Sequence, residues 1–121
     1  MMFFNVSYKY HSRLFLSLCI LLCMFSSIVF AAGEHQLIQA VKRGDSESVA
    51  RLISESSNVS ASEADGTTAL HWAVHRDDVE ITQQLIFAEA NVDAANDYGV
   101  TPLYIACTNR NNELAKNLLV A

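Results

Sequence analysis

The sequence repeats itself at an interval of 33 residues, and this repeat limits the possible folds more than any other feature of the chain. The same residue recurs at that interval, with no gap, in several pairs: Gly66 and Gly99, Thr68 and Thr101, Leu70 and Leu103, Ala73 and Ala106, Glu80 and Glu113, Leu85 and Leu118. The interval also leads back from Leu70 to Leu37 and from Ala73 to Ala40. Self-similarity at this period is typical of proteins built from stacked repeats.

Each unit has the pattern turn, short helix, turn, helix, loop. In the last unit Gly99 supplies a turn that needs positive φ, Thr101 suits the N-cap, and Pro102 suits the first helical position. Leu103 and Ala106 are three residues apart and therefore share one helix face. The alanine lets a neighbouring helix approach closely.

The second helix of each unit has one apolar face, formed by Ile81, Leu85 and Ile86 in the middle unit and by Leu114, Leu118 and Leu119 in the last. Two helices this short cannot bury that face by themselves. Stacking of similar units buries it, so the sequence predicts an all-α solenoid.

These residues resemble the ankyrin-repeat family. Residues 65–73, DGTTALHWA, are similar to the family's D-x-x-G-x-T-P-L-H-x-A pattern, with Ala69 in place of proline; residues 101–106, TPLYIA, have Tyr104 in place of histidine. Gly44 keeps the glycine that closes the first helix, whereas Asp77 and Arg110 replace it. Glu89 replaces a glycine in the following loop, and the resemblance covers residues 34–121.

The resemblance implies helix-turn-helix units with β-turn loops, in about two and a half to three repeats. We expect an N-terminal capping repeat over 33–63, a repeat over 64–96 and a truncated repeat over 97–121. No polar cap precedes Ala121, so Leu118, Leu119 and Val120 are expected to lack a cover. The chain would then be a fragment of a longer repeat array, have its end covered by a partner or second copy, or precede an effector or enzymatic domain after Ala121.

The N-terminal segment, residues 1–32, has the pattern of an export signal. Lys9 and Arg13 precede 19 uncharged residues, Leu14–Ala32, and small residues for cleavage stand near Ala31, Ala32 and Gly33. We expect Sec-type export and a periplasmic or secreted repeat domain. The alternative is a retained signal anchor, since 19 apolar residues can just span a bilayer, with the repeats outside the cytoplasm.

Charge and cysteine content exclude two classes of protein. Residues 32–121 contain six basic and thirteen acidic side chains, so they should repel nucleic acid, and the membrane is expected as a partner only through a retained anchor. Cys107 is the only cysteine of the exported part, which rules out an internal disulfide there.

Few residues suggest catalysis or metal binding. His71 and His75 are four residues apart, but Trp72 stands where the zincin motif H-E-x-x-H requires glutamate. The family resemblance implies instead that His71 bonds the turn and joins adjacent repeats, and that Cys107 and Trp72 are packing residues. We find no phosphate-binding glycine motif and predict neither an enzyme nor a cofactor or metal site in this segment.

The remaining candidate function is protein binding. The resemblance implies that a partner protein meets the turn tips and the exposed face of the first helices, at Asp65, Thr67, His75, Arg76, Asp97, Tyr98, Val100, Thr108 and Asn109. Tyr98 is the strongest candidate, because tyrosine is enriched at binding hot spots; the alternative is that it packs on the neighbouring turn. Asp65 and Asp97 suit a basic partner, or they bond their own backbone.

Overall fold

The computed structural model describes residues 35–55 and 57–121, which lie in one compact unit. The segment 1–32, with its expected cleavage region at Ala31 and Ala32, and Gly33 lie outside the described residues. Within the described part, every regular element is a helix, apart from one isolated β-bridge between Ser62 and Thr68. The all-α prediction is confirmed.

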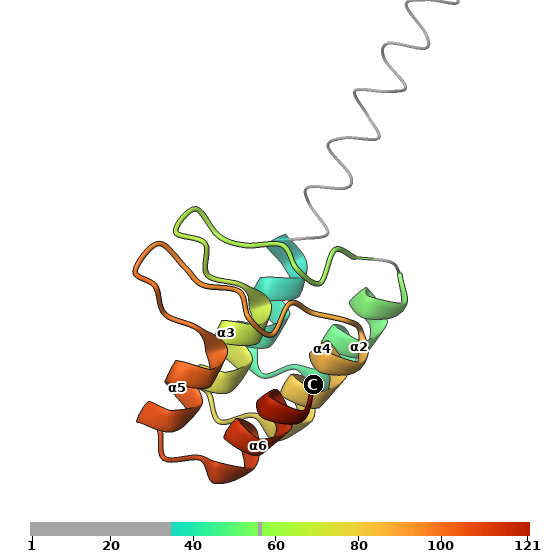
Figure 1. The fold of residues 1–121 in the computed structure, drawn as a ribbon. Helices are drawn as coiled ribbons and strands as arrows, with labels where there is room; N and C mark the ends of the chain where they lie inside the picture. The colour runs from blue at the N-terminus through green and yellow to red at the C-terminus, as the bar shows by residue number, and fades with distance from the viewer. Residues whose placement is uncertain (1–34, 56) are drawn as a thin grey trace, which may run out of the picture. The chain divides into compact units, whose positions relative to one another are not determined.

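The helices form three antiparallel pairs in two layers (Figure 1). The first helices of the pairs are residues 35–43, α3 (Ala69–His75) and α5 (Pro102–Thr108). The second helices are α2 (Ser46–Ser54), α4 (Val79–Phe87) and α6 (Asn112–Val120). The loops of residues 57–68 and 88–101 project from the same side of this stack.

The 33-residue period places a similar N-cap at the start of the second helix of each pair. The side chains of Asp45, Asp78 and Asn111 accept hydrogen bonds from the amides of Ser48, Ile81 and Leu114, at 3.0, 3.0 and 3.1 Å. Each bond satisfies one of the amides that a helix N-terminus leaves without a partner.

The turns inside the pairs follow the same register. Gly44 has φ +72°, and the residues at its equivalents, Asp77 and Arg110, have φ +56° and +57°. The left-handed conformation that the glycine pattern requires is therefore kept by non-glycine residues. Glu89, with φ +62°, is a third such site.

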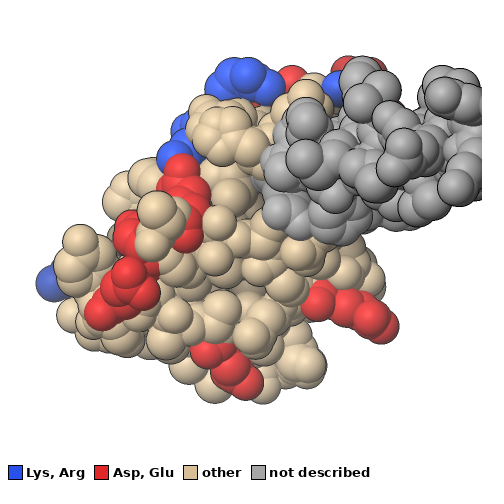
Figure 2. Space-filling model, turned by 90° about the horizontal axis from the view of Figure 1, so that it is seen from above, with Lys and Arg blue, Asp and Glu red and all other residues tan. Residues whose placement is uncertain are grey.

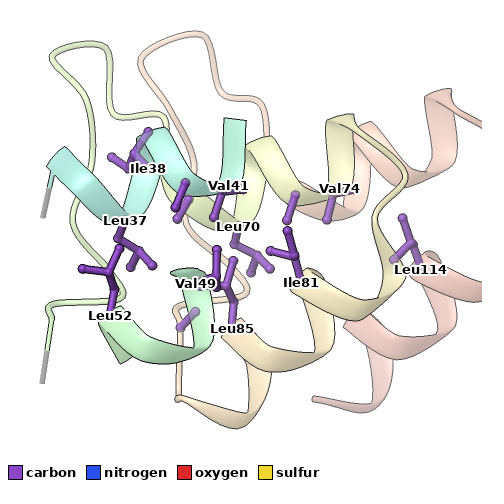
Figure 3. Close-up of a cluster of buried hydrophobic side chains, with 14 of the residues drawn as sticks. Leu37, Ile38, Val41, Val49, Leu52, Leu70, Val74, Ile81, Leu85 and Leu114 are labelled. Atoms are coloured by element: carbon purple, nitrogen blue, oxygen red, sulfur yellow. The ribbon is translucent and has the colours of Figure 1, made fainter. Parts of the chain in front are cut away.

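The core lies between the two layers of helices (Figure 3). Ala40, Ala73 and Ala106, one from each first helix, are all fully buried. Larger side chains fill the space between the layers, among them Leu37, Val41, Val49, Leu70, Ile81, Leu85 and Leu114. The small residues let adjacent first helices approach, and α3 packs directly on α5.

Two expectations about burial are wrong. Cys107 is exposed, not a buried small residue, although Val41 and Val74 at the same register are fully buried. Leu118 is buried, because it packs in the core with its equivalents Leu52 and Leu85 and needs no further repeat to cover it. Leu119 and Val120 are exposed, as expected.

Candidate functional site

A cleft of about 220 Å³ lies on the loop side of the molecule; we call it the loop-side cleft. Its walls come from the two long loops and the first helices. The lining residues are Asp65, Thr67, His71, Trp72, His75, Asn96 and Ile105. Three of them, Asp65, Thr67 and His75, belong to the partner-binding set predicted from the sequence.

His71 ties the base of this cleft to the two loops. Its Nδ1 accepts a hydrogen bond from the Thr68 amide at 3.2 Å and lies 2.8 Å from the Thr68 hydroxyl. Because Nδ1 accepts from an amide, Nε2 carries the proton and donates it to the Val100 carbonyl at 2.9 Å. The histidine therefore joins one turn to the next repeat, as the resemblance implied.

These bonds also determine whether His71 could bind a metal ion together with His75. Both ring nitrogens of the buried His71 are engaged with protein groups, so the Nδ1 lone pair is used by Thr68 and the Nε2 proton by the Val100 carbonyl. In the described part of the chain, no group of three or more His, Cys, Asp or Glu side chains could hold a metal ion.

Trp72 and His75 form an aromatic wall. Their rings meet edge to face, with centroids 5.8 Å apart. The Trp72 indole donates to Glu63 at 2.8 Å, and the Lys42 ammonium lies over the indole ring, 4.3 Å from its centroid. Lys42 also pairs with Glu63, and this bond, followed by that from Trp72, holds the pKa of the Glu63 carboxyl below its usual range.

The two loop tips are fastened to each other. The amide of Asp97 donates to the carbonyl of Asp65 at 2.9 Å, and Asn96 donates to the Thr67 hydroxyl at 3.4 Å. The Asp65 carboxylate accepts a hydrogen bond from the Thr67 amide at 3.0 Å, and this bond lowers the pKa of the Asp65 carboxyl. Asp65 thus bonds its own backbone while lining the cleft.

The other predicted binding residues have different surroundings. Tyr98 is 78% exposed, and Val100 is half-buried with its carbonyl held by His71. Arg76 donates to the Lys42 carbonyl at 2.9 Å, and Asn109 donates to the Val74 and His75 carbonyls at 3.3 and 3.4 Å. These two side chains link adjacent pairs.

Thr108 bonds within its own helix, donating to the Tyr104 carbonyl at 2.8 Å. Four cleft residues, His71, Trp72, Asn96 and Ile105, are absent from the set predicted to bind a partner. The repeat register links Ile105 only to Trp72, which was itself predicted to pack, and so gives no signal for binding.

The loop side carries mainly acidic charge. Seen from this side, acidic side chains occupy several places on the surface, and the basic ones lie toward its edges (Figure 2).

No helix among the described residues is long and apolar enough to cross a membrane.

Comparison with known proteins agrees with the geometry. A family model for ankyrin repeats in three copies matches residues 37–121. The chain belongs to the ankyrin-repeat family. Ankyrin repeats are in general protein–protein interaction modules without catalytic activity of their own. No curated protein matches the chain closely.

Proposed function

We propose that this chain is an exported ankyrin-repeat module that binds a partner protein through the loop-side cleft. The observation that carries the proposal is the cleft itself, an open hollow of about 220 Å³ with one aromatic wall. Tyr98 at the adjacent tip offers an exposed aromatic contact.

Preorganisation supports this assignment. The Asp97–Asp65 bond joins the tips, and the His71–Val100 bond fixes the loop to the helix below it. A surface already held in one conformation loses little conformational freedom when a partner docks, so more of the contact energy remains for binding. The module acts as a rigid scaffold.

Affinity capture with matched variants tests the site. Ile105→Glu places a charge in the half-buried wall of the cleft, and Lys116→Ala alters an exposed position on α6. A partner captured by the wild-type chain should be lost with Ile105→Glu and kept with Lys116→Ala, provided that both variants keep the wild-type circular dichroism. Equal capture by the two variants would contradict the proposed site.

Export rests on the sequence of residues 1–33 and has its own test. Mass spectrometry of the chain from periplasmic and culture fractions should find a species shortened by about 31 to 33 residues. An uncut chain in the membrane fraction would indicate the anchored alternative. Recovery of the uncut chain in the cytoplasm would contradict export.

A further inference from the structure

The lining of the loop-side cleft contains one fixed charge, the carboxylate of Asp65, and includes no lysine or arginine. Hydrogen bonds from Thr67, first of all from its amide, hold the pKa of the Asp65 carboxyl below its usual range. This carboxyl is therefore ionised at neutral pH. A ligand that enters the cleft meets a negative charge that no basic residue of the lining balances.

A second carboxylate, that of Asp97, lies at the adjoining loop tip. A Cβ built on Gly66 would lie 3.5 Å from the Asp97 Oδ1, so this carboxylate is close to the turn that follows Asp65. The backbone bond between Asp97 and Asp65 holds the two tips together. In the described part of the chain, neither carboxylate takes part in an ion pair. The tips therefore attract a positively charged group.

The hydrogen-bond donors of the cleft lining are largely engaged within the protein. The His71 ring gives its proton to the Val100 carbonyl, and the Asn96 amide group donates to the Thr67 hydroxyl. The Asp65 carboxylate, in contrast, accepts the Thr67 amide at 3.0 Å and has about four acceptor positions in total. The cleft therefore suits a ligand group that carries positive charge and donates several hydrogen bonds.

The aromatic wall of the cleft favours one kind of cation. Trp72 and His75 meet edge to face, and Ile105 adds an apolar side chain to the same lining. The Lys42 ammonium already lies 4.3 Å from the centre of the Trp72 ring, and Glu63 balances its charge. A planar guanidinium can stack on such groups while its N–H groups reach a carboxylate, whereas an ammonium is a compact, strongly hydrated charge. The wall therefore favours arginine over lysine.

We propose that the loop-side cleft binds an arginine side chain of the partner protein, with the guanidinium against Trp72 and His75 and its N–H groups donating to Asp65. This inference rests on the proposed docking at the cleft and names the chemistry that the partner must present. The lining residues come from the second and third helix pairs and their loops. Because hydrogen bonds already hold the tips, little conformational freedom is lost when the arginine enters.

Peptide selection on the full-length chain, in micelles of an uncharged detergent, tests this inference. The probe is a library of random heptapeptides without tryptophan, and we expect the retained peptides to share an arginine. Binding of a retained peptide is then followed by the fluorescence of Trp72, the chain's only tryptophan and a residue of the cleft. Replacement of the arginine by lysine should weaken binding about threefold, and replacement by uncharged citrulline about tenfold.

Two variants of the chain locate the charge that the arginine meets. Asp65→Asn should weaken binding of the retained peptide about fivefold or more, because it removes the charge but keeps an acceptor for the Thr67 amide. Asp93→Asn removes the same charge at an exposed position outside the cleft and should change the affinity less than about twofold. Circular dichroism of both variants must match that of the wild-type chain.

Four results would each overturn the inference: no retained peptide, retained peptides that share no arginine, equal affinities of the arginine and lysine peptides, or equal effects of the two variants. The peptide series leaves the chain unchanged and decides the question if Asp65→Asn does not fold. The proposed function fails separately. A partner that is lost with Ile105→Glu but kept by Asp65→Asn would still dock in the cleft, without an arginine at Asp65.

Discussion

At the scale of single residues, the structure depends on polar side chains that bond the backbone of a neighbouring segment. His71 is the central case, since it is buried and serves both the Thr68 turn and the Val100 loop. Arg76 and Asn109, at the ends of α3 and α5, also donate hydrogen bonds to backbone carbonyls of the preceding pair, at more exposed positions.

His71→Ala should destabilise the fold by about 2 to 3 kcal/mol, because it leaves the Thr68 amide and the Val100 carbonyl without their partner. Urea denaturation measures the loss. His75→Ala is the matched control, and its exposed side chain should cost no more than about 0.5 kcal/mol. Equal losses in the two variants would show that the His71 bonds add nothing to stability.

The carboxylates of the loops and caps make the fold sensitive to acid. Hydrogen bonds from Lys42 to Glu63, from the Thr67 amide to Asp65 and from the Ser48 hydroxyl to Asp45 lower the pKa of each carboxyl in the folded chain. The unfolded chain then binds more protons at low pH, so acid favours unfolding.

The stability that these three carboxylates contribute should be fully present above about pH 5 and should be lost as the pH drops from there through the lowered pKa values. Urea midpoints at a series of pH values measure this. Glu63→Gln should reduce the fall of the urea midpoint at low pH, because the glutamine amide does not titrate. A midpoint that stays flat or rises between pH 5 and pH 3 would contradict the assigned bonds.

At the scale of elements, the turns inside the second and third helix pairs keep, without glycine, the left-handed conformation that Gly44 adopts in the first pair. Arg110 is exposed and adopts φ +57° at the end of α5, a region that costs an L-residue with a Cβ about 1 kcal/mol or more. Gly66 has φ +78°, and a Cβ there would lie 3.1 Å from the Asn96 Cα.

Arg110→Gly should stabilise the chain by about 0.5 to 1 kcal/mol, since relief of the left-handed strain exceeds the added entropy of the unfolded chain. Gly66→Ala should destabilise it by about 1 to 3 kcal/mol, through the strained φ and the close backbone. Gly99→Ala, with the same strain but nothing within 4 Å of its Cβ, should cost less. Thermal unfolding measures the melting temperatures of the three variants. We expect them to decrease from Arg110→Gly through Gly99→Ala to Gly66→Ala, and a different order would contradict this account.

The elements themselves could be predicted from the sequence. The 33-residue register marked the helix pairs, the Thr101 cap and the non-glycine turns at Asp77 and Arg110, because each of these depends on local chain geometry. The exposure of Cys107 could not be predicted in the same way. Its equivalents Val41 and Val74 are fully buried, and a repeat pattern in the sequence does not distinguish the surroundings of one unit from those of the next.

The candidate site was predicted in part for a related reason. Asp65, Thr67 and His75 follow from the family resemblance, and all three line the cleft. Ile105 was not predicted as a binding residue, since its role arises only when α5 lies beside α3 and the two loops add their residues to the walls of the cleft. Asn109 holds the Val74 and His75 carbonyls, a link between pairs that no local pattern indicates.

At the scale of the whole molecule, the loop-side cleft is a surface prepared for docking. It lies beside loop tips that hydrogen bonds hold in place. A partner would therefore dock on a site that already has its binding conformation.

Residue-specific photocross-linking tests the central claim, that a partner protein docks on the loop side, most directly. A photoreactive residue replaces Tyr98 at the tip, Ile105 in the cleft, or Glu80, exposed at the start of α4, in chains produced in living cells. The account predicts that positions 98 and 105 cross-link the same protein and that position 80 does not. A protein cross-linked from position 80 and from neither of the other two would contradict it.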